Sequence, residues 1–231
     1  MRQVKIGVLG GIGPESSAEY YLKLIKGLQQ KNCVHSNPDY PQIIINSVPA
    51  REFPAEVDIS KDLRDIDQLY ITGVKQLDQI GVDFVVIVCN SAHVFYKELA
   101  DSIKVPILDL RDEVRKELLK RHIHKSVVLG TPWTIQTGLY DFEGITTLKL
   151  RSDDILQLYR SIYSFNLGNY DQPKNTVKEM AKRYVEAGAE IVILGCTEVA
   201  LMLQDEALPV LNTVDVLVWS TIEKFCKLRD G

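Results

Sequence analysis

Two cysteines in similar surroundings are the residues of this chain that could do chemistry together. Cys89 ends the apolar run DFVVIVC (83–89) and is followed by an asparagine and a serine. Cys196 ends the similar run EIVILGC (190–196) and is followed by a threonine and a glutamate. A lone cysteine at the end of a buried strand is usually a small apolar filler. Two cysteines in matching positions, each followed by polar residues, indicate a function instead.

Two thiols on opposite faces of a tetrahedral carbon could invert that carbon. A cysteine between a strand and a helix N-terminus lies near backbone N–H groups and the positive end of the helix dipole, which favour the thiolate. The thiolate takes a proton from one face, a protonated thiol returns one on the other, and reversal exchanges the roles. Each sulfur must come within about 3.5 Å of the carbon, so the sulfurs must lie about 7 Å apart, much further than in a disulfide. Cys89 and Cys196 are therefore predicted to be a catalytic acid and base.

Acid and base alone do not make the α-carbon of an amino acid reactive enough. General acid–base catalysis supplies about 10² to 10⁴ in rate. Backbone N–H groups and hydroxyls around the substrate carboxylate are the expected source of further stabilisation. Candidates at the predicted strand ends are Gly10, Gly11, Asn90, Ser91, Thr131 and Thr197.

The elements that must position these residues follow an alternating pattern. Short β-branched runs alternate with stretches of helical period, which predicts βαβ units and an α/β fold with mainly parallel sheets. Most runs are apolar at successive positions, as in strands buried on both faces. The predicted strands are Val4–Leu9, Ile43–Val48, Phe84–Val88, Pro106–Leu108, Val127–Leu129, Thr146–Leu150, Ile191–Leu194 and Pro209–Leu211.

Capping signals predict where two of the helices begin. Ser16, with a glutamate three residues on, is typical of a capping box. The helix that follows is predicted to bury an apolar face made of Ala18, Tyr21, Leu22, Ile25 and Leu28. Thr176 carries the same signal for a helix that ends at Gly188, a residue suited to a left-handed cap. A terminal helix is predicted around residues 216–225.

An internal repeat relates the two halves of the chain. A glycine lies eight residues before Cys89 and another lies eight residues before Cys196. Two further pairs of segments match in the same order, 5–10 with 125–130 and 105–109 with 208–212. The sequence therefore predicts a duplicated α/β unit with approximate two-fold symmetry. Because ligands of parallel sheets bind beyond the carboxyl ends of the strands, two facing halves would enclose one cleft, with a cysteine on each wall.

The composition of the 231-residue chain excludes some function classes. The net charge is −4 and the basic residues are scattered, so no surface for nucleic acid or an anionic membrane is expected. No apolar run reaches the roughly 18 residues of a membrane span, and Lys5 interrupts the region where a signal peptide is apolar. We expect a cytoplasmic protein with small-molecule partners. Its four cysteines are then thiols, and Cys33 and Cys226, which have no counterparts, are interpreted as ordinary buried thiols.

Four segments resemble the aspartate/glutamate racemase family, and its aspartate racemase branch in particular. They are GVLGGIGPES (7–16), VVIVCNSAH (85–93), VVLGT (127–131) and ILGCTEV (193–199). The resemblance implies a cofactor-independent amino-acid racemase that uses the paired cysteines, with two pseudo-symmetric flavodoxin-like halves, an active site between them and a homodimeric state. By analogy the halves are residues 1–104 with 214–231, and residues 105–213. Glu198 favours the aspartate branch, because glutamate racemases usually have histidine there.

Two departures from the family pattern concern the substrate. Ser91 replaces the commoner threonine and keeps the hydroxyl. Some aspartate racemases bind the second carboxylate through an arginine, for which Arg51 is the candidate, and a lysine from the second half. The segment 163–171 has no basic residue, Asn166 takes the place of the lysine, and residues 166–173 are predicted to be a long loop. A broader substrate range than dicarboxylates therefore stays open.

The sequence contains no clear motif for binding a cofactor or a metal ion. The glycines of residues 7–16 lack the spacing and acidic residue of a dinucleotide fold, and no lysine adjoins the strand ends to hold pyridoxal phosphate. His93 lies four residues after Cys89, but zinc needs further ligands, and a histidine that is hydrogen-bonded near the helix start, or simply lies on the helix surface, is the preferred interpretation. Glu198 could orient the substrate amino group, tune Cys196, or complement a helix N-terminus. Arg51 could equally be a surface charge.

Two other functions would suit the same residues. A two-lobed small-molecule binding protein needs no thiol pair. A Cys→Ser change at both positions that retains ligand affinity while abolishing deuterium exchange would distinguish the enzyme from the binding protein. A maleate-type cis–trans isomerase would use one cysteine as a nucleophile and form a covalent adduct. Exchange of the α-proton with solvent would favour the racemase.

Overall fold

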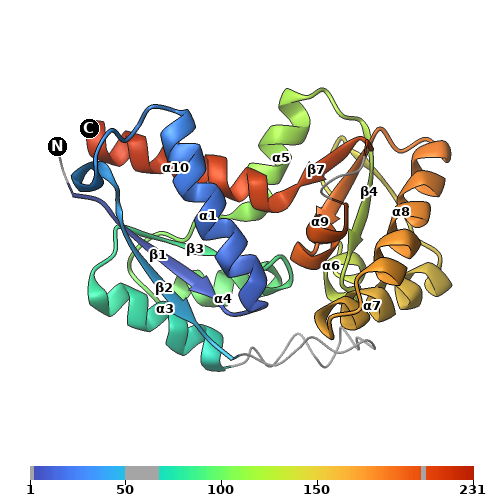
Figure 1. Ribbon diagram of the computed structural model, residues 1–231, viewed down its shortest axis with the longest axis horizontal. Helices are drawn as coiled ribbons and strands as arrows, with labels where there is room; N and C mark the ends of the chain where they lie inside the picture. The colour runs from blue at the N-terminus through green and yellow to red at the C-terminus, as the bar shows by residue number, and fades with distance from the viewer. Residues whose placement is uncertain (1–2, 50–67, 204–206) are drawn as a thin grey trace. The chain divides into compact units, whose positions relative to one another are not determined.

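The computed structural model describes residues 3–49, 68–203 and 207–231, which divide into two compact units (Figure 1). Within the described residues, unit 1 comprises 3–49, 68–110 and 214–231, and unit 2 comprises 111–203 and 207–213. Each unit contains a parallel sheet with helices packed on it. The α/β fold with two parallel sheets confirms the predicted fold class.

Unit 1 is built on a parallel sheet of strand order β2-β1-β3 within its described residues. In Figure 1, α1 and α10 lie on one side of this sheet and α3 lies on the other. Its strands are β1 (Lys5–Gly10), β2 (Gln42–Ser47) and β3 (Phe84–Ile87). Its helices are α1 (Pro14–Gln30), η1 (Asn37–Asp39), α3 (Gln68–Ile80), η2 (Ser91–Phe95), α4 (Tyr96–Asp101) and, at the C-terminus, α10 (Thr213–Asp230).

Unit 2 is built on a parallel sheet of strand order β5-β4-β6-β7 within its described residues. Side chains of β4 and β6 form its apolar core together with α7, α8 and α9. The strands are β4 (Lys125–Gly130), β5 (Thr146–Leu148), β6 (Ile191–Gly195) and β7 (Val210–Asn212). The helices are α5 (Leu110–Lys120), α6 (Pro132–Gln136), α7 (Ser152–Asn166), α8 (Asp171–Glu186) and α9 (Thr197–Leu203). No helix in the described parts of the chain has the length and hydropathy to cross a membrane.

The two sheets share one topology. The first strand of each unit, β1 or β4, lies between the second and third strands of that unit. The predicted strand at Pro106–Leu108 is wrong as a full strand, because Ile107 forms only an isolated parallel bridge to Val85. That bridge still stands beside β3 where β7 stands beside β6. The shared order is what a duplicated α/β unit predicts.

Helix α1 begins earlier, and faces differently, than the sequence pattern predicts. It starts at Pro14, whose missing N–H costs nothing in the first turn, so the capping box predicted at Ser16 is wrong. The predicted apolar face is confirmed at Leu28, which is buried, but is otherwise rotated by about one residue: Tyr20 and Leu24 are buried, whereas Tyr21 and Leu22 are exposed. The face that α1 buries is set by its packing on α10, where the Tyr20 hydroxyl donates to the Thr221 hydroxyl at 2.8 Å.

Helices α7 and α8 leave a shorter connection than predicted. The predicted long loop at 166–173 is wrong, because α7 runs through Asn166 and α8 begins at Asp171. The capping box at Thr176 is wrong too, since this residue lies inside α8 and its hydroxyl donates to the Gln172 carbonyl at 2.9 Å. The predicted helix end is confirmed, because Gly188 has φ +99° just beyond α8.

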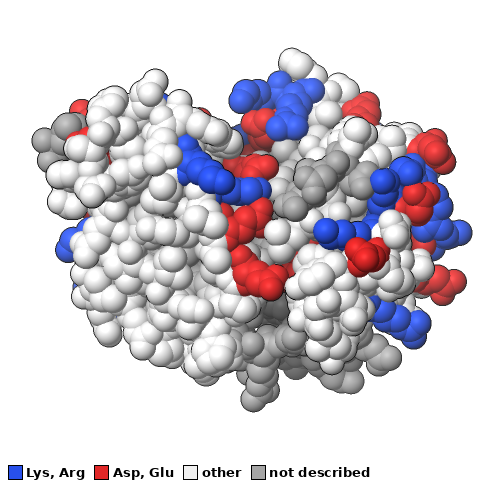
Figure 2. All heavy atoms as spheres, in the orientation of Figure 1, with Lys and Arg blue, Asp and Glu red and all other residues white. Residues whose placement is uncertain are grey.

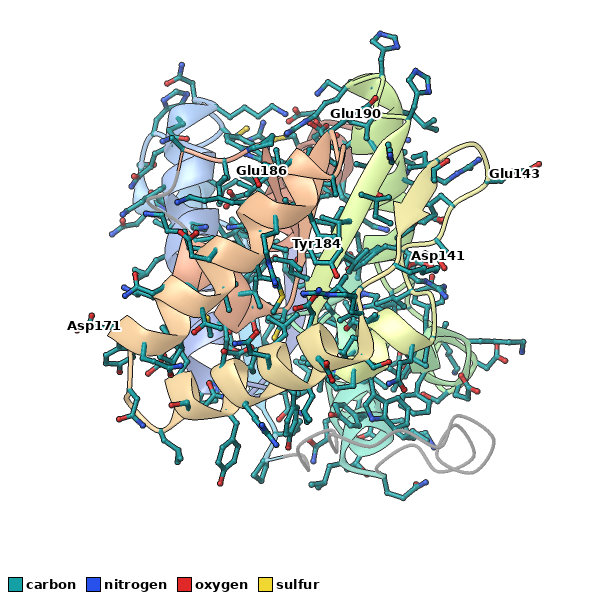
Figure 3. The ribbon with its side chains drawn as sticks, turned by 90° about the vertical axis from the view of Figure 1, so that its right-hand side faces the viewer. Asp141, Glu143, Asp171, Tyr184, Glu186 and Glu190 are labelled. Atoms are coloured by element: carbon teal, nitrogen blue, oxygen red, sulfur yellow. The ribbon has the colours of Figure 1, made fainter. Side chains whose placement is uncertain are left out.

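A buried carboxylate joins α7 to α8 in unit 2. Asp154 is 3% exposed and accepts hydrogen bonds from Arg151 at 3.0 Å, Arg183 at 2.7 Å and the Tyr184 hydroxyl at 2.8 Å. Figure 3 labels Tyr184 on α8. Burial alone would raise the pKa of Asp154, but the hydrogen bonds from Arg151, Tyr184 and Arg183 outweigh it and lower the pKa to about 2. The carboxylate is therefore ionised in the folded unit well below neutral pH.

We expect Asp154→Asn to destabilise the protein by about 2 to 3 kcal/mol at pH 7. The lowered pKa means that ionised Asp154 stabilises the fold above its unfolded pKa of about 3.9, and that this contribution disappears as pH falls from about 5 to about 2. The gap between wild type and variant should therefore close over the same range in urea unfolding followed by circular dichroism. Asp153→Asn, at the exposed neighbouring position, is the matched control. A gap independent of pH would contradict this account.

Candidate active site

In unit 1 the predicted residues meet at the carboxyl edge of the sheet. Cys89 lies two residues beyond β3, and Gly10 ends the neighbouring strand β1. The ladder continues past β3, because Val88 N–H donates to the Leu9 carbonyl at 3.0 Å. Cys89 is 8% exposed, and the Asn90 that follows it is 3% exposed. The thiol is thus held in a buried position just beyond the carboxyl end of β3, which pairs with the central strand β1.

The loop after β1 is fixed by a serine that the sequence analysis did not single out. Gly11 has φ +87°, and its N–H donates to the Ser17 hydroxyl at 2.9 Å. A Cβ at Gly10 would lie 2.5 Å from the same hydroxyl oxygen, so a larger residue there would displace Ser17. Ser17 in turn donates to the Gly13 carbonyl at 3.2 Å. Its position one turn into α1, directly after a glycine-rich strand end, was the available signal.

Backbone contacts shape the turn that carries Cys89. Asn90 and Ser91 lead into the 3₁₀ helix η2, and Ser91 is 2% exposed. The His93 Nδ1 atom lies 2.8 Å from the Cys89 carbonyl oxygen, and the ring is fully buried. Of the two alternatives for His93, the hydrogen-bonded residue near a helix start is confirmed, and the surface position is wrong. Among the described residues no cluster of three His, Cys, Asp or Glu side chains could hold a metal ion.

In unit 2 the predicted residues also lie at the carboxyl edge of the sheet. Cys196 directly follows β6, and Thr131 directly follows β4. The strand ends are close neighbours, because Gly130 pairs with Gly195 and a Cβ on Gly130 would lie 2.7 Å from the Gly195 carbonyl oxygen. Thr131 is the N-cap of α6, and its hydroxyl accepts from the Thr134 N–H at 3.3 Å. The two predicted residues therefore follow adjacent strand ends.

Cys196 has an acidic neighbour within hydrogen-bond distance. Its Sγ donates to Glu198 Oε2 at 2.8 Å, and the Thr197 hydroxyl donates to the same oxygen at 3.0 Å. All three side chains are buried, with exposures of 6%, 5% and 9% along the chain. The Cys196 carbonyl also accepts the Ala200 N–H at 3.1 Å, which places this cysteine at the start of α9. The glutamate thus contacts the thiol that the sequence singled out.

Two of the predicted substrate-binding residues, Asn166 and Arg51, do not directly follow a described strand end. Asn166 is the last residue of α7 and is exposed. Helix α7 packs on α6 and α9, which both begin at the carboxyl ends of strands. Arg51 lies outside the described residues.

The comparison with known families is decisive for the class of protein. A model described as Asp/Glu/Hydantoin racemase matches residues 9–221. The chain belongs to this family. The match covers both strand-end cysteines and confirms the resemblance inferred from the sequence. As a member of a racemase family, the chain is an isomerase.

Individual members of this racemase family align with the chain over nearly its full length. The chain is 29% identical over 225 residues to the broad specificity amino-acid racemase RacX of Bacillus subtilis (strain 168), covering 95% of this chain and 97% of that protein. An aspartate racemase homologue from Pyrococcus horikoshii OT3 superposes with a TM-score of 0.72 at 24% identity, covering 96% and 99% of the two chains. The Picrophilus torridus aspartate racemase gives 0.75 at 20% identity, covering 97% and 94%. These structures show that the chain shares their fold.

Proposed function

We propose that the chain is a cofactor-independent amino-acid racemase in which Cys89 and Cys196 are the two bases. The observation that carries this proposal is the equivalent position of the two thiols. Each follows the third strand of its unit, β3 or β6, beside the glycine-rich end of the first strand. A single buried cysteine needs no such counterpart. Membership of a racemase family supplies the reaction class that uses the pair.

In the proposed reaction the two cysteines exchange roles with direction. For one enantiomer the Cys89 thiolate takes the α-proton, while the Cys196 thiol delivers a proton to the opposite face of the carbon. The products are the other enantiomer, a Cys89 thiol and a Cys196 thiolate, and the reverse reaction regenerates the starting pair. This requires both sulfurs to reach one substrate carbon from opposite sides, about 3.5 Å from each.

Glu198 supports the assignment of Cys196 as the resting proton donor. A thiol that donates to a carboxylate 2.8 Å away is stabilised in its protonated form, because ionisation would place two negative charges side by side. Such a group is suited to give a proton rather than to take one. We propose that the backbone N–H groups and side chains of Asn90 and Ser91 hold the substrate carboxylate as charge develops at the α-carbon. The Thr197 hydroxyl joins them when its proton turns from Glu198 to the substrate.

We propose a substrate range wider than the acidic amino acids. Of the two cations that would hold a second substrate carboxylate, Arg51 is a candidate for the arginine, but the lysine has no counterpart, because the α7–α8 connection, 167–170, carries no lysine or arginine. Asn166 beside it can donate hydrogen bonds to neutral as well as charged groups. The relative named as a broad specificity racemase, aligned over almost the whole chain, supports the same proposal.

Proton exchange in D₂O tests this function directly. The purified protein is incubated with a panel of L- and D-amino acids, without added cofactor, while NMR follows the α-proton and chiral chromatography follows the enantiomers. We expect loss of the α-proton signal together with appearance of the opposite enantiomer. Ligand binding without exchange would instead show a binding protein. A covalent cysteine adduct without exchange would show a cis–trans isomerase.

We also propose that the chain forms a homodimer through α1. Tyr21 is 40% exposed and Leu22 is 57% exposed on this helix. Most of the face of unit 1 seen in Figure 2 carries no charged side chain, and the charged ones lie mainly along α1. A second copy would cover the exposed Tyr21 and Leu22 side chains, with the charged residues of α1 at the edge of the contact. Sedimentation velocity should therefore give twice the 26.1 kDa chain mass.

Leu22→Glu is expected to convert the dimer to a monomer, because it places a charge within the proposed apolar contact. Leu119→Glu on α5, a position 49% exposed, is the matched control and should leave the dimer intact. A wild-type protein that sediments as a monomer at micromolar concentration would refute the homodimer.

A further inference from the structure

The two cysteines without counterparts in the repeat lie against each other in unit 1. Cys33 follows α1, and Cys226 lies in the last turns of α10, 193 positions later. Their Sγ atoms are 2.7 Å apart. A further approach of about 0.7 Å would bring them to the length of an S–S bond, about 2.05 Å. Both are free thiols in the structure.

Other contacts hold these two segments in register. Lys23 on α1 lies 2.7 Å from Asp215 at the start of α10. Further along, a Cβ on Gly27 would lie 2.5 Å from the Ile222 side chain, so only glycine allows the helices this close. Near the chain end the Arg229 guanidinium donates to the Cys33 carbonyl. The thiols are thus positioned by contacts along the α1–α10 packing and not by their own attraction.

We propose that Cys33 and Cys226 are a redox modification site, at which a small disulfide such as oxidised glutathione converts the two thiols to a reversible disulfide. The bond would fasten the end of α10 to the segment that follows α1. This matters for the fold because α10 returns to unit 1 only after the chain has passed through all of unit 2. The proposal rests on the thiol geometry and is independent of the proposed racemase function.

The oxidation balances as two thiol–disulfide exchanges. One protein thiolate attacks a sulfur of oxidised glutathione, which forms a mixed disulfide and releases one glutathione thiolate. The second protein thiolate then attacks the protein sulfur of that mixed disulfide and releases the second glutathione. Two electrons pass to the oxidant, and the two thiol protons end on the two glutathione molecules. A dithiol reductant reverses both steps.

Access and protonation set the speed of this reaction. Cys33 is 9% exposed, whereas Cys226 is partly exposed and can be reached by a small oxidant. Burial, followed by the adjacent Cys33 sulfur, raises the pKa of Cys226 to about 11, against smaller opposing effects of Arg229 and Lys31. Because the thiolate is the nucleophile, oxidation should be slow at pH 7 and faster at pH 9.

The test uses the full chain with Cys89→Ser and Cys196→Ser, so that the remaining thiols are Cys33 and Cys226. After incubation with oxidised glutathione, the denatured protein should show no free thiol with Ellman's reagent. Peptide mass spectrometry should find residues 33 and 226 cross-linked with loss of two hydrogens. The melting temperature should rise by about 5 °C or more, because the bond closes a very long loop. Dithiothreitol should reverse all three changes.

A Cys226→Ser change added to the same background is the matched control. It should stop at the mixed disulfide of Cys33 or remain a free thiol, with no rise in melting temperature. Two mixed disulfides, or two unreacted thiols at pH 9, in the unaltered pair would overturn the proposed site. A cross-link without thermal stabilisation would overturn its role in fastening α10.

Discussion

Replacing either Cys89 or Cys196 by alanine is expected to reduce racemisation by at least about 10³-fold. The proposed inversion needs a proton acceptor on one face of the carbon and a donor on the other, and neither thiol can serve both faces. The measurement is the initial rate of enantiomer formation by chiral chromatography, in both directions. Since the two thiols act as a unit, the double variant should be little worse than either single variant.

Each single variant should keep a half-reaction that identifies its role. The remaining thiol can still remove a proton from the enantiomer it faces and return deuterium to the same side. In D₂O, Cys196→Ala and Cys89→Ala should therefore exchange the α-proton of opposite enantiomers without inverting them. Cys33→Ala, assayed under reducing conditions, is the matched cysteine control and should keep wild-type rates. Racemisation at the wild-type rate in either active-site variant would refute the two-base mechanism.

The strand-end motifs could be predicted from the sequence because they depend on local signals. Consecutive β-branched residues make a strand buried on both faces, and the polar residues after it mark the edge where the strand stops. Those signals are sufficient to place Cys89 beyond β3 and Cys196 beyond β6. The repeat of spacing between the halves similarly anticipated the common strand order of the two sheets.

Features set by tertiary contacts could not be predicted in this way. The buried face of α1 depends on how closely Gly27 lets α10 approach, and α10 lies almost two hundred residues away. The Cys33–Cys226 contact depends on the same packing, so spacing gave no sign of it. Thr176 has a residue type that favours caps, but the packing of α8 places it inside the helix. Local propensity is overridden where burial decides.

Glu198→Gln is expected to lower kcat/KM by about 10-fold to 100-fold while leaving the fold intact. Glutamine nearly preserves the shape of the side chain but removes the negative charge of the carboxylate, whose Oε2 atom lies 2.8 Å from Cys196 Sγ and accepts its hydrogen bond. Without that charge the Cys196 thiolate is no longer repelled by its neighbour, so the resting proton donor is lost. Alkylation of Cys196 by iodoacetamide at pH 7 should therefore become several-fold faster as racemisation becomes slower.

This pair of readouts separates positioning of the thiol from a purely structural role. Glu198 also lies in the first turn of α9, where a carboxylate complements the helix dipole by about 0.3 to 1 kcal/mol. If that were its whole role, Glu198→Gln would lower the unfolding free energy slightly and leave both rates unchanged. Glu198→Asp, which keeps the charge, should recover the slow alkylation. Glu186→Gln, at an exposed position labelled in Figure 3, controls for loss of an acidic side chain in the same unit. Slower racemisation combined with faster alkylation would assign Glu198 to the thiol, because loss of helix stability alone cannot produce both.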